Sequence, residues 1–275
     1  MLHCGKFQFD LARPLVMGIV NITPDSFSDG GQHASTAAAI AHARQLIADG
    51  ADILDIGGES TRPGAAPVSE QQELDRVLPV IEGLCGTGVP ISIDTWKPQV
   101  MRAALAAGAV MVNDVNALQA EGALQAVAET DAAVCLMHKQ GTPQTMQQRP
   151  EYRDVITVVS RFLGERIAAA EAAGIARQRM VIDPGFGFGK TLAHNLDLLR
   201  ELAAFRALGV PVLAGLSRKS MLGAITGREV GERVAASVAA ALLAVQRGAA
   251  IVRVHDVRET VDALKILNAM NESER

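Results

Sequence analysis

Residues 91–138 read ISIDTWKPQVMRAALAAGAVMVNDVNALQAEGALQAVAETDAAVCLMH, and two kinds of segment alternate along them. Short runs rich in Val, Ile and Leu begin at Ile91, Val110 and Ala133. Runs that are apolar at neighbouring positions are typical of parallel strands covered on both faces. The segments between these runs have room for a helix, which a connection between parallel strands requires. This stretch therefore predicts successive strand–helix units.

The same alternation extends over the rest of the chain. Further strand-like runs begin near Val16, Ile53, Met180, Val212 and Ile251, which makes eight in 275 residues. Helices are expected over 35–49, 70–85, 97–107, 121–130, 154–173, 194–208, 231–247 and 257–270. Eight strand–helix units in a chain of this length match an α/β fold of the (β/α)8 TIM barrel type. The alternative is an open doubly wound sheet, which periodicity does not exclude but which the lack of a linker between halves disfavours.

The domain organisation follows from the same pattern. No linker rich in Ser, Gly or Pro divides the chain, so we expect a single domain over residues 1–275 with its barrel core at about 16–270. Residues Lys6–Pro14 are expected to form a short N-terminal hairpin that closes the bottom of the barrel.

The composition excludes several classes of protein. It is 49% hydrophobic and 20% charged, as in globular proteins, and 26 Lys and Arg against 30 Asp and Glu leave no basic excess for nucleic acid. The longest apolar stretch, Val234–Val245, is interrupted by Ser237 and is shorter than the ~20 residues of a membrane span. The N-terminal residues lack an export-signal pattern, and Cys4, Cys85 and Cys135 form no disulfide or zinc framework. We therefore expect a cytoplasmic protein without nucleic-acid or membrane partners.

Polar residues lie at, or directly after, the end of every predicted strand. They are Asn21, Glu59, Thr61, Arg62, Asp94, Asn113, Asp114, His138, Asp183, Ser217, Arg218, Lys219, Arg253 and His255. One such residue is usually a turn or a helix cap, but caps are a poor explanation for polar residues at all eight strand ends. In (β/α)8 barrels the chemistry takes place at these carboxyl ends. We therefore take this set as the candidate site.

The residue types in the set suit a flat heterocycle that carries a diphosphate. The carboxylate of Asp183 and the amide of Asn113 can pair with an amidine-like ring edge. Positive charge for the phosphates comes from Arg62, Lys219, Arg253 and His255. Asn21 offers a hard oxygen ligand for Mg²⁺, which typically uses few protein ligands together with substrate phosphates. No Cys or Ser has the base partner of an activated nucleophile, so the pattern predicts a heterocyclic diphosphate that ionises.

Two further features lie next to these residues. The segments Asn21–Ala34 and Gly57–Ser69 each exceed about 12 residues and are rich in Gly, Pro, Ser and Asp, so we expect lids over the substrate. The alternative for each is a plain exposed connector. The stretch DPGFGFGKT at 183–191 fails as a phosphate loop at Pro184 and as a dinucleotide fingerprint at Lys190. We interpret its glycines as a tight loop that lets the backbone approach a ligand.

Several motifs, in order and in the expected strand–helix units, together resemble the dihydropteroate synthase family. They are N-x-T-P-D-S-F-S-D-G-G at 21–31, G-G-E-S-T-R-P-G at 57–64, D-T-x-K-P at 94–98, Asn113-Asp114, D-P-G-F-G-F-G-K at 183–190, S-R-K-S at 217–220 and R-V-H-D at 253–256. The resemblance implies a transferase of folate biosynthesis that condenses 6-hydroxymethyl-7,8-dihydropterin diphosphate with 4-aminobenzoate, giving 7,8-dihydropteroate and pyrophosphate. It also implies Mg²⁺, a homodimer and a dissociative reaction through a pterin-methyl cation.

The resemblance assigns roles to individual residues. Catalytic roles fall to Asp94, Lys219 and Arg62, and the pterin pocket contains Asp94, Asn113, Asp183 and Lys219. Pyrophosphate is expected at Asn21, Arg62, Arg253 and His255, with Asn21 also holding Mg²⁺. The 4-aminobenzoate is expected among Phe27, Thr61, Pro63, Phe188, Ser217 and Lys219.

Some positions and some alternatives fall outside this assignment. Trp96, Asn116 and Lys139 differ from the family's usual pattern, but none belongs to the expected ligand set. A non-catalytic pterin-binding paralogue is one alternative, although both loops and the cations are present. A methyltransferase that uses a reduced folate is a second, with no evident use for the S-R-K stretch. A phosphate-binding barrel isomerase is a third, and it predicts turnover of a single sugar phosphate.

Overall fold

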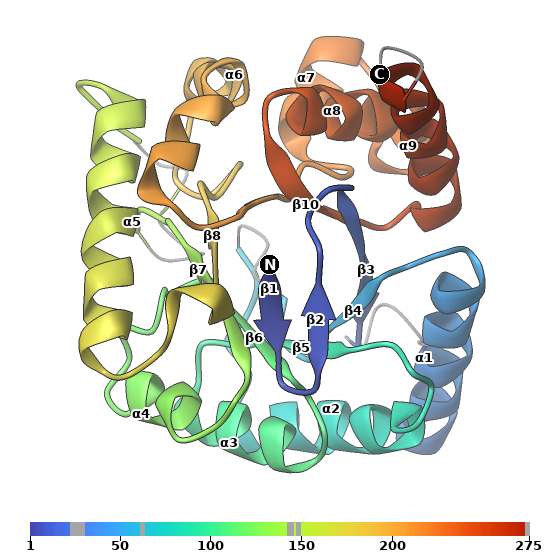
Figure 1. Ribbon diagram of the computed structural model, residues 1–275. Helices are drawn as coiled ribbons and strands as arrows, with labels where there is room; N and C mark the ends of the chain where they lie inside the picture. The colour runs from blue at the N-terminus through green and yellow to red at the C-terminus, as the bar shows by residue number, and fades with distance from the viewer. Residues whose placement is uncertain (23–30, 61–63, 142–145, 147–149, 273–275) are drawn as a thin grey trace.

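The computed structural model describes residues 1–22, 31–60, 64–141, 146 and 150–272, and the predicted barrel is present within them (Figure 1). Eight parallel strands close in the order β10-β3-β4-β5-β6-β7-β8-β9. They are β3 (Leu15–Asn21), β4 (Ile53–Gly57), β5 (Ile91–Asp94), β6 (Met111–Asp114), β7 (Ala133–Met137), β8 (Met180–Asp183), β9 (Val212–Ala214) and β10 (Ala249–Val254). Because the ring of strands is closed, the open doubly wound sheet is excluded.

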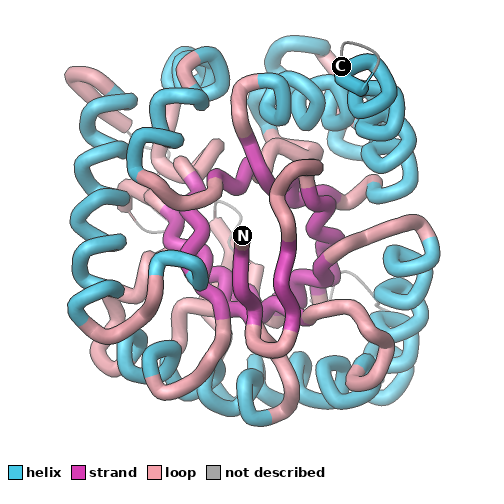
Figure 2. Tube along the Cα trace, in the orientation of Figure 1, coloured by secondary structure: helices cyan, strands magenta, loops and turns pink. Residues whose placement is uncertain are grey.

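Helices form an outer layer around the strands, as the tube view shows (Figure 2). The α-helices are α1 (Gly31–Ala48), α2 (Glu70–Leu84), α3 (Pro98–Ala106), α4 (Ala123–Ala128), α5 (Val155–Ala172), α6 (Leu192–Arg200), α7 (Ser220–Thr226), α8 (Val234–Gln246) and α9 (Val257–Glu272). Local sequence sets several of their starts. Ser69 accepts a hydrogen bond from the Gln72 N–H in a capping box before α2, and Asp154 caps α5.

Two helical expectations differ from the structure. The helix expected over 194–208 is divided, because Glu201 leaves α-helical geometry (φ −101°, ψ 20°) and a 3-10 helix, η3 (Leu202–Leu208), follows. The expected start of the next helix at 231 falls in the short 3-10 helix η4 (Val230–Glu232), and α8 begins only at Val234. Helix α7 was not expected. A 3-10 turn, η2 (Arg177–Arg179), precedes β8.

An N-terminal hairpin closes the amino end of the barrel, but it lies earlier in the chain than predicted. Strands β1 (Leu2–Cys4) and β2 (Phe7–Phe9) pair antiparallel, so the boundaries Lys6–Pro14 were wrong. The turn falls at Gly5, whose φ of 55° suits a residue without a side chain. Figure 1 shows the hairpin across the end of the barrel nearest the viewer. The carboxyl ends of the strands therefore lie at the far end.

Side chains inside the barrel alternate with side chains that face the helices. Leu2 and Cys4 of the hairpin pack with an inner cluster that includes Met17, Ile53 and Met111. The intervening strand residues join a larger cluster beneath the helices. Since strand residues two apart share a face, Asn21, Asp55, Gly57 and Asn113 point into the barrel with that inner cluster.

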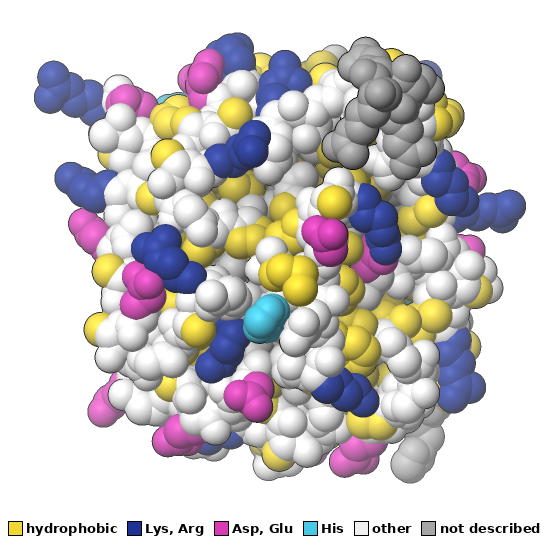
Figure 3. Space-filling model, in the orientation of Figure 1, with side chains coloured by type: hydrophobic (Ala, Val, Ile, Leu, Met, Phe, Trp, Pro, Cys, Tyr) yellow, Lys and Arg dark blue, Asp and Glu magenta, His cyan; other side chains and the backbone are white. Residues whose placement is uncertain are grey.

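Charged side chains of both signs are mixed on the face of the molecule that Figure 3 shows. On the face in Figure 3, Lys and Arg side chains are dispersed and lie among Asp and Glu. In the described part of the chain, no helix combines the length and apolarity needed to cross a membrane.

Candidate active site

Three of the expected site residues lie at one height at the carboxyl end of the barrel. The strand register pairs Asn21 with Gly57, Gly57 with Asp94, and Asp94 with Asn113. Gly57 contributes no side chain to this layer. A Cβ built at Gly57 would lie 3.7 Å from Oδ2 of Asp94 and 3.9 Å from Oδ1 of Asn21. Asn21 and Asp94 therefore border the same small space.

Arg253 reaches this layer from deeper in the barrel. Its backbone pairs with Met17, which lies two inward positions below Asn21 on β3. The Arg253 Nε donates to Oδ2 of Asp55 at 2.5 Å, and its Nη2 donates to Oδ2 of Asp94 at 2.7 Å. Burial alone would lower the pKa of Arg253, but the two carboxylates raise it above its usual value. The guanidinium is thus a fixed positive charge between two acids.

The carboxylate of Asp94 has a strongly raised pKa. Burial raises its pKa to about 7, and Arg253 opposes that rise. The negative charges of Asp55, Glu73 and Asp114 add to it. The protonation of Asp94 therefore depends on the balance between its burial and the charges around it.

Asp55 links two expected site residues, although the sequence patterns did not single it out. It is fully buried in the middle of β4, and its Oδ2 accepts the Asn113 Nδ2–H at 2.9 Å as well as the Arg253 bond. A signal was present in the sequence. Asp55 is the one charged residue in the run ILDIG, where a strand covered on both faces is expected to be apolar.

Asp183 and Lys219 complete the cluster from the opposite strands. A Cβ built at Gly215 would lie 3.8 Å from Oδ2 of Asp183, 4.0 Å from Nζ of Lys219 and 3.9 Å from Cβ of Arg253. The three side chains therefore surround the space above Gly215. Oδ1 of Asp183 accepts the Gly185 N–H at 2.7 Å, and burial raises the Asp183 pKa while Lys219 opposes the rise.

The ammonium of Lys219 is held close to an aromatic ring. It donates to the carbonyl of Phe186 and lies 4.8 Å from the ring centre of Phe188. Burial lowers the pKa of Lys219 to about 8, and the charge of Asp183 counteracts this. Phe188, expected beside 4-aminobenzoate, is thus adjacent to the cation expected to touch both substrates.

Ser217 and His255 form a pair at the same end of the barrel. The Ser217 Oγ accepts the backbone N–H of His255 at 3.1 Å and lies 3.0 Å from its Nδ1. Because Oγ already accepts from the backbone, its own proton can be donated to Nδ1. That leaves Nε2 of His255 as an N–H donor, which suits an anion.

A buried ion cluster fixes the base of the second long segment. Lys97 Nζ donates to Glu59 at 3.0 Å, to Glu73 at 2.5 Å and to the Val68 carbonyl at 2.6 Å. Glu59 in turn accepts the Val68 N–H and the Trp96 Nε1–H, each at 3.0 Å. Both backbone groups of Val68 are therefore held. Sequence reasoning assigned no role to Lys97 or Glu73.

The glycine-rich loop after β8 is tight, as expected, but its closest approaches are to protein. A Cβ at Gly185 would lie 1.9 Å from the carbonyl oxygen of His138, and one at Gly189 would lie 2.4 Å from that of Gln140. Lys190 Nζ lies 3.0 Å from His138 Nδ1 and donates to the Gly185 carbonyl at 2.9 Å. Two of these glycines and Lys190 therefore join this loop to the end of β7.

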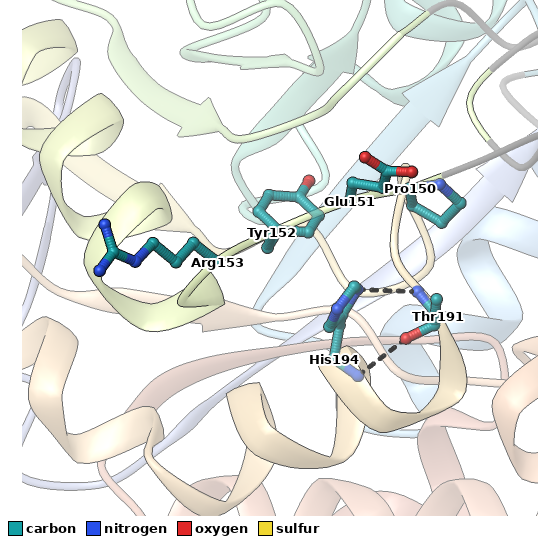
Figure 4. A pocket seen from close by; sticks show the side chains of 6 residues that line it. All are labelled: Pro150, Glu151, Tyr152, Arg153, Thr191 and His194. Atoms are coloured by element: carbon teal, nitrogen blue, oxygen red, sulfur yellow. Dashed lines mark hydrogen bonds between the residues drawn. The ribbon is translucent and has the colours of Figure 1, made fainter.

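A cavity of about 650 Å³ lies outside this cluster (Figure 4). Its lining residues are Pro150, Glu151, Tyr152, Arg153, Thr191 and His194. Thr191 and His194 bond each other's backbone N–H groups in a capping box at the start of α6, so their polar atoms already serve the helix. None of the expected ligand residues within the described ranges lines this cavity.

The structure thus brings together most of the expected site residues. Those that share the carboxyl end are Asn21, Asp94, Asn113, Asp183, Phe188, Ser217, Lys219, Arg253 and His255. Phe27, Thr61, Arg62 and Pro63 lie outside the described residues. Each residue's role toward a ligand stays a prediction.

Comparisons with known proteins agree with this geometry. A family described as pterin binding enzyme matches residues 17–255. A dihydropteroate synthase of Escherichia coli is 52% identical over 263 residues, which cover 95% of this chain and 93% of that protein. One from Neisseria meningitidis serogroup B is 54% identical over 275 residues, covering 98% of this chain and 96% of the relative.

Solved structures give the same result. The Xanthomonas albilineans dihydropteroate synthase with 4-aminobenzoic acid has a TM-score of 0.90 and 59% identity, covering 95% of this chain and 94% of the other. The Burkholderia cenocepacia dihydropteroate synthase complexed with 7,8-dihydropteroate has a TM-score of 0.92 and 52% identity, covering 100% and 97%.

Proposed function

The chain belongs to the pterin binding enzyme family, and from this premise we propose how it acts. It catalyses the dihydropteroate synthase reaction, joining 6-hydroxymethyl-7,8-dihydropterin diphosphate to 4-aminobenzoate with release of pyrophosphate. The observation that carries the proposal is the cluster of Asp94, Asn113, Asp183, Lys219 and Arg253 around one space at the barrel's carboxyl end. No observation on the described residues favours the methyltransferase, the isomerase or the non-catalytic paralogue.

The pterin is bound through its hydrogen-bonding edge. Asp183 accepts two N–H groups of the amidine-like edge, and Asn113 meets a neighbouring edge with its amide. Lys219, positioned beside Asp183, donates to a ring acceptor. Burial of Asp183 and Asn113 makes an unpaired polar group there costly, so a ring with the wrong donor pattern is rejected.

The reaction is dissociative. The bond between the pterin methylene carbon and the diphosphate oxygen breaks first, and its electron pair leaves with the pyrophosphate. Asp94, when ionised, stabilises the pterin-methyl cation by its charge. The amine nitrogen of 4-aminobenzoate then forms the new C–N bond and loses a proton. No protein nucleophile takes part.

The other binding roles follow the positions of the remaining residues. His255, Arg253 and Asn21, with Arg62, bind the pyrophosphate, and Ser217 orients His255. Phe188 and Ser217, with Phe27, Thr61 and Pro63, hold the 4-aminobenzoate. Arg253 is hydrogen-bonded to Asp55 and Asp94 in the structure. Because Asp94 is assigned to the pterin, we expect Arg253 to bind the pyrophosphate next to the pterin pocket.

Mg²⁺ is the proposed cofactor, and the donors fit an ion that arrives with its substrate. Asn21 places an amide oxygen near Asp94 across Gly57. Among the described residues, no three His, Cys, Asp or Glu side chains form a cage for a metal. Such a donor set suits Mg²⁺ bound by one protein oxygen and the diphosphate. When bound, the ion would neutralise charge on the leaving pyrophosphate.

We also propose a homodimer and a cytoplasmic location. Exposed apolar side chains lie along neighbouring helices: Ile225 on α7, Leu243 on α8, and Ile266 and Met270 on α9. Figure 1 shows these three helices side by side. An apolar face of this kind supports association of two copies. Cys4, Cys85 and Cys135 are free thiols, as a reducing compartment favours.

The test is pyrophosphate release from the dihydropterin diphosphate, with and without 4-aminobenzoate and with and without Mg²⁺. The expected result is Mg²⁺-dependent release with formation of dihydropteroate when both substrates are present. Tight binding of the pterin diphosphate without turnover would instead identify a non-catalytic pterin-binding protein. Failure to bind it at all would contradict the pterin site.

A further inference from the structure

Asp55 is a buried acid to which the proposed reaction assigns no part. Its strand β4 lies two strands from β6, which carries Asn113, and two strands from β10, which carries Arg253. Its Oδ2 accepts the Asn113 Nδ2–H at 2.9 Å and the Arg253 Nε–H at 2.5 Å. Its Oδ1 is buried and has no hydrogen-bond partner among the described residues. One oxygen atom therefore joins the two sides of the site.

The bond to Asn113 decides which way that amide points. In this bond the Asn113 NH₂ group donates and the Asp55 carboxylate accepts, so the NH₂ group of Asn113 is turned toward Asp55. Asp55 lies two residues before Gly57, one inward layer below Asn113. The Asn113 carbonyl oxygen is consequently directed away from Asp55 and is left to accept a hydrogen bond from a ligand.

The bond to Arg253 fixes a planar group in the same way. Nε is held by Asp55, and Nη2 of the same rigid guanidinium then meets Asp94 at 2.7 Å. Without the hydrogen bond to Asp55, the long Arg253 side chain could rotate and lose its contact with Asp94. The orientation of Asn113 and the partner of Asp94 thus depend on the same carboxylate.

We propose that Asp55 is a positioning residue of the pterin site, which sets the Asn113 amide with its acceptor toward the substrate and holds Arg253 against Asp94. The role rests on the proposed function, since Asn113 and Asp94 are assigned to the pterin there. Asp55 itself lies beneath the substrate layer. Its effect on binding passes through Asn113 and Arg253.

A double-mutant cycle tests the link to Asn113. Binding of the dihydropterin diphosphate would be measured by calorimetry for wild type, Asp55→Leu, Asn113→Ala and the double variant. Each single substitution is expected to weaken binding by about 10- to 100-fold, because a buried charged hydrogen bond is lost. If Asp55 acts through Asn113, the double variant binds only slightly more weakly than Asn113→Ala. Losses that multiply in full would overturn the link.

A second variant keeps the test decisive if Asp55→Leu does not fold. Asp55→Asn preserves the shape of the side chain and an acceptor oxygen, but it removes a negative charge that contributes to the raised pKa of Asp94. The other charged groups that act on Asp94, namely Arg253, Glu73 and Asp114, stay unchanged. The Asp94 pKa should therefore fall. The acid limb of kcat/KM against pH should move to lower pH. A limb that stays in place would overturn the role of Asp55 beside Asp94.

Controls separate this inference from the proposed function. Asp52→Asn alters an acid at the amino end of β4, where it bonds Arg13 and the Val16 N–H, and should leave binding and the pH profile unchanged. If the wild type makes no dihydropteroate, the proposed function fails. If the wild type is active and both Asp55 variants behave like it, only the positioning role fails.

Discussion

Gly215 lies between Asp183, Lys219 and Arg253, and the lack of a side chain there leaves space beside these three polar groups, where we propose the pterin ring. Its backbone has no left-handed conformation, so a substitution would meet no backbone strain. A Cβ would sit at ordinary contact distance, 3.8–4.0 Å, from the three neighbours. Ala is therefore compatible with the protein itself, whereas a larger side chain would enter the space proposed for the pterin ring.

We expect Gly215→Val to weaken binding of the dihydropterin diphosphate by about 10- to 100-fold, since two methyl groups would extend from a Cβ already in contact. Calorimetric titration would measure this, with Gly215→Ala expected to lie between the variant and wild type. Gly231→Val is the matched control, because a Cβ there has no neighbour within 4 Å. Normal pterin affinity in Gly215→Val would show that the ring does not occupy this space.

The residues that could be predicted from sequence are those at strand ends. Asp94 and Asp183 end their strands and Asn113 is the penultimate residue of its strand, and the barrel topology alone places such residues together. Asp55 was missed because it lies inside β4, whereas the expectation for (β/α)8 barrels concerns the residues at the carboxyl ends of the strands. The glycines of 183–191 show a further limit, because sequence cannot tell whether a close approach is to a ligand or to the backbone of His138.

Lys97 forms hydrogen bonds that connect helix α2 with the segment Gly57–Ser69. It lies just before α3, and it bonds Glu73 on α2 and Glu59 and Val68 in the segment after β4. The side chain of Glu73 is fully buried, and burial raises its pKa while Lys97 lowers it. The ammonium is therefore the charge that makes a buried carboxylate tolerable at this place.

We expect Lys97→Met to lower the free energy of unfolding by about 3 kcal/mol, because it leaves a buried acid without its cation. Urea denaturation at neutral pH would measure the loss. Lys97→Met combined with Glu73→Leu should recover part of it, since the unpaired charge is then gone as well. Lys265→Met, which removes an exposed pair with Asp262, should change stability by less than about 0.5 kcal/mol. Equal losses for the two lysines would contradict the account.

Elements that follow the strand–helix alternation were predicted well, and elements outside that alternation were not. The eight barrel strands were found because each is an apolar run with a helix-length segment after it. Helix α7 was not predicted because it is an additional helix between β9 and β10, a connection to which the strand–helix alternation had already assigned one helix. The hairpin was displaced because its turn depends on Gly5, and a single glycine near a terminus is a weak turn signal.

The two ends of the barrel differ in composition. The carboxyl end carries the charged cluster, and the amino end is filled by the hairpin, where Leu2 is fully buried against the inner strand residues. Residues at the amino end should therefore affect stability and not chemistry. The two ends are separated by the inner cluster that includes Met17, Ile53 and Met111, all of which are fully buried.

Leu2→Ala should accordingly lower the free energy of unfolding by about 3 kcal/mol, through lost burial and the cavity it leaves. Denaturant titration would measure this, and Met1→Ala is the control because Met1 is 63% exposed. The KM for both substrates and kcat should stay at wild-type values in Leu2→Ala at a temperature where it is folded. Gly215→Val should show the reverse, with weakened binding and little loss of stability. A Leu2 variant with impaired pterin binding would mean that the hairpin is coupled to the site through the inner cluster.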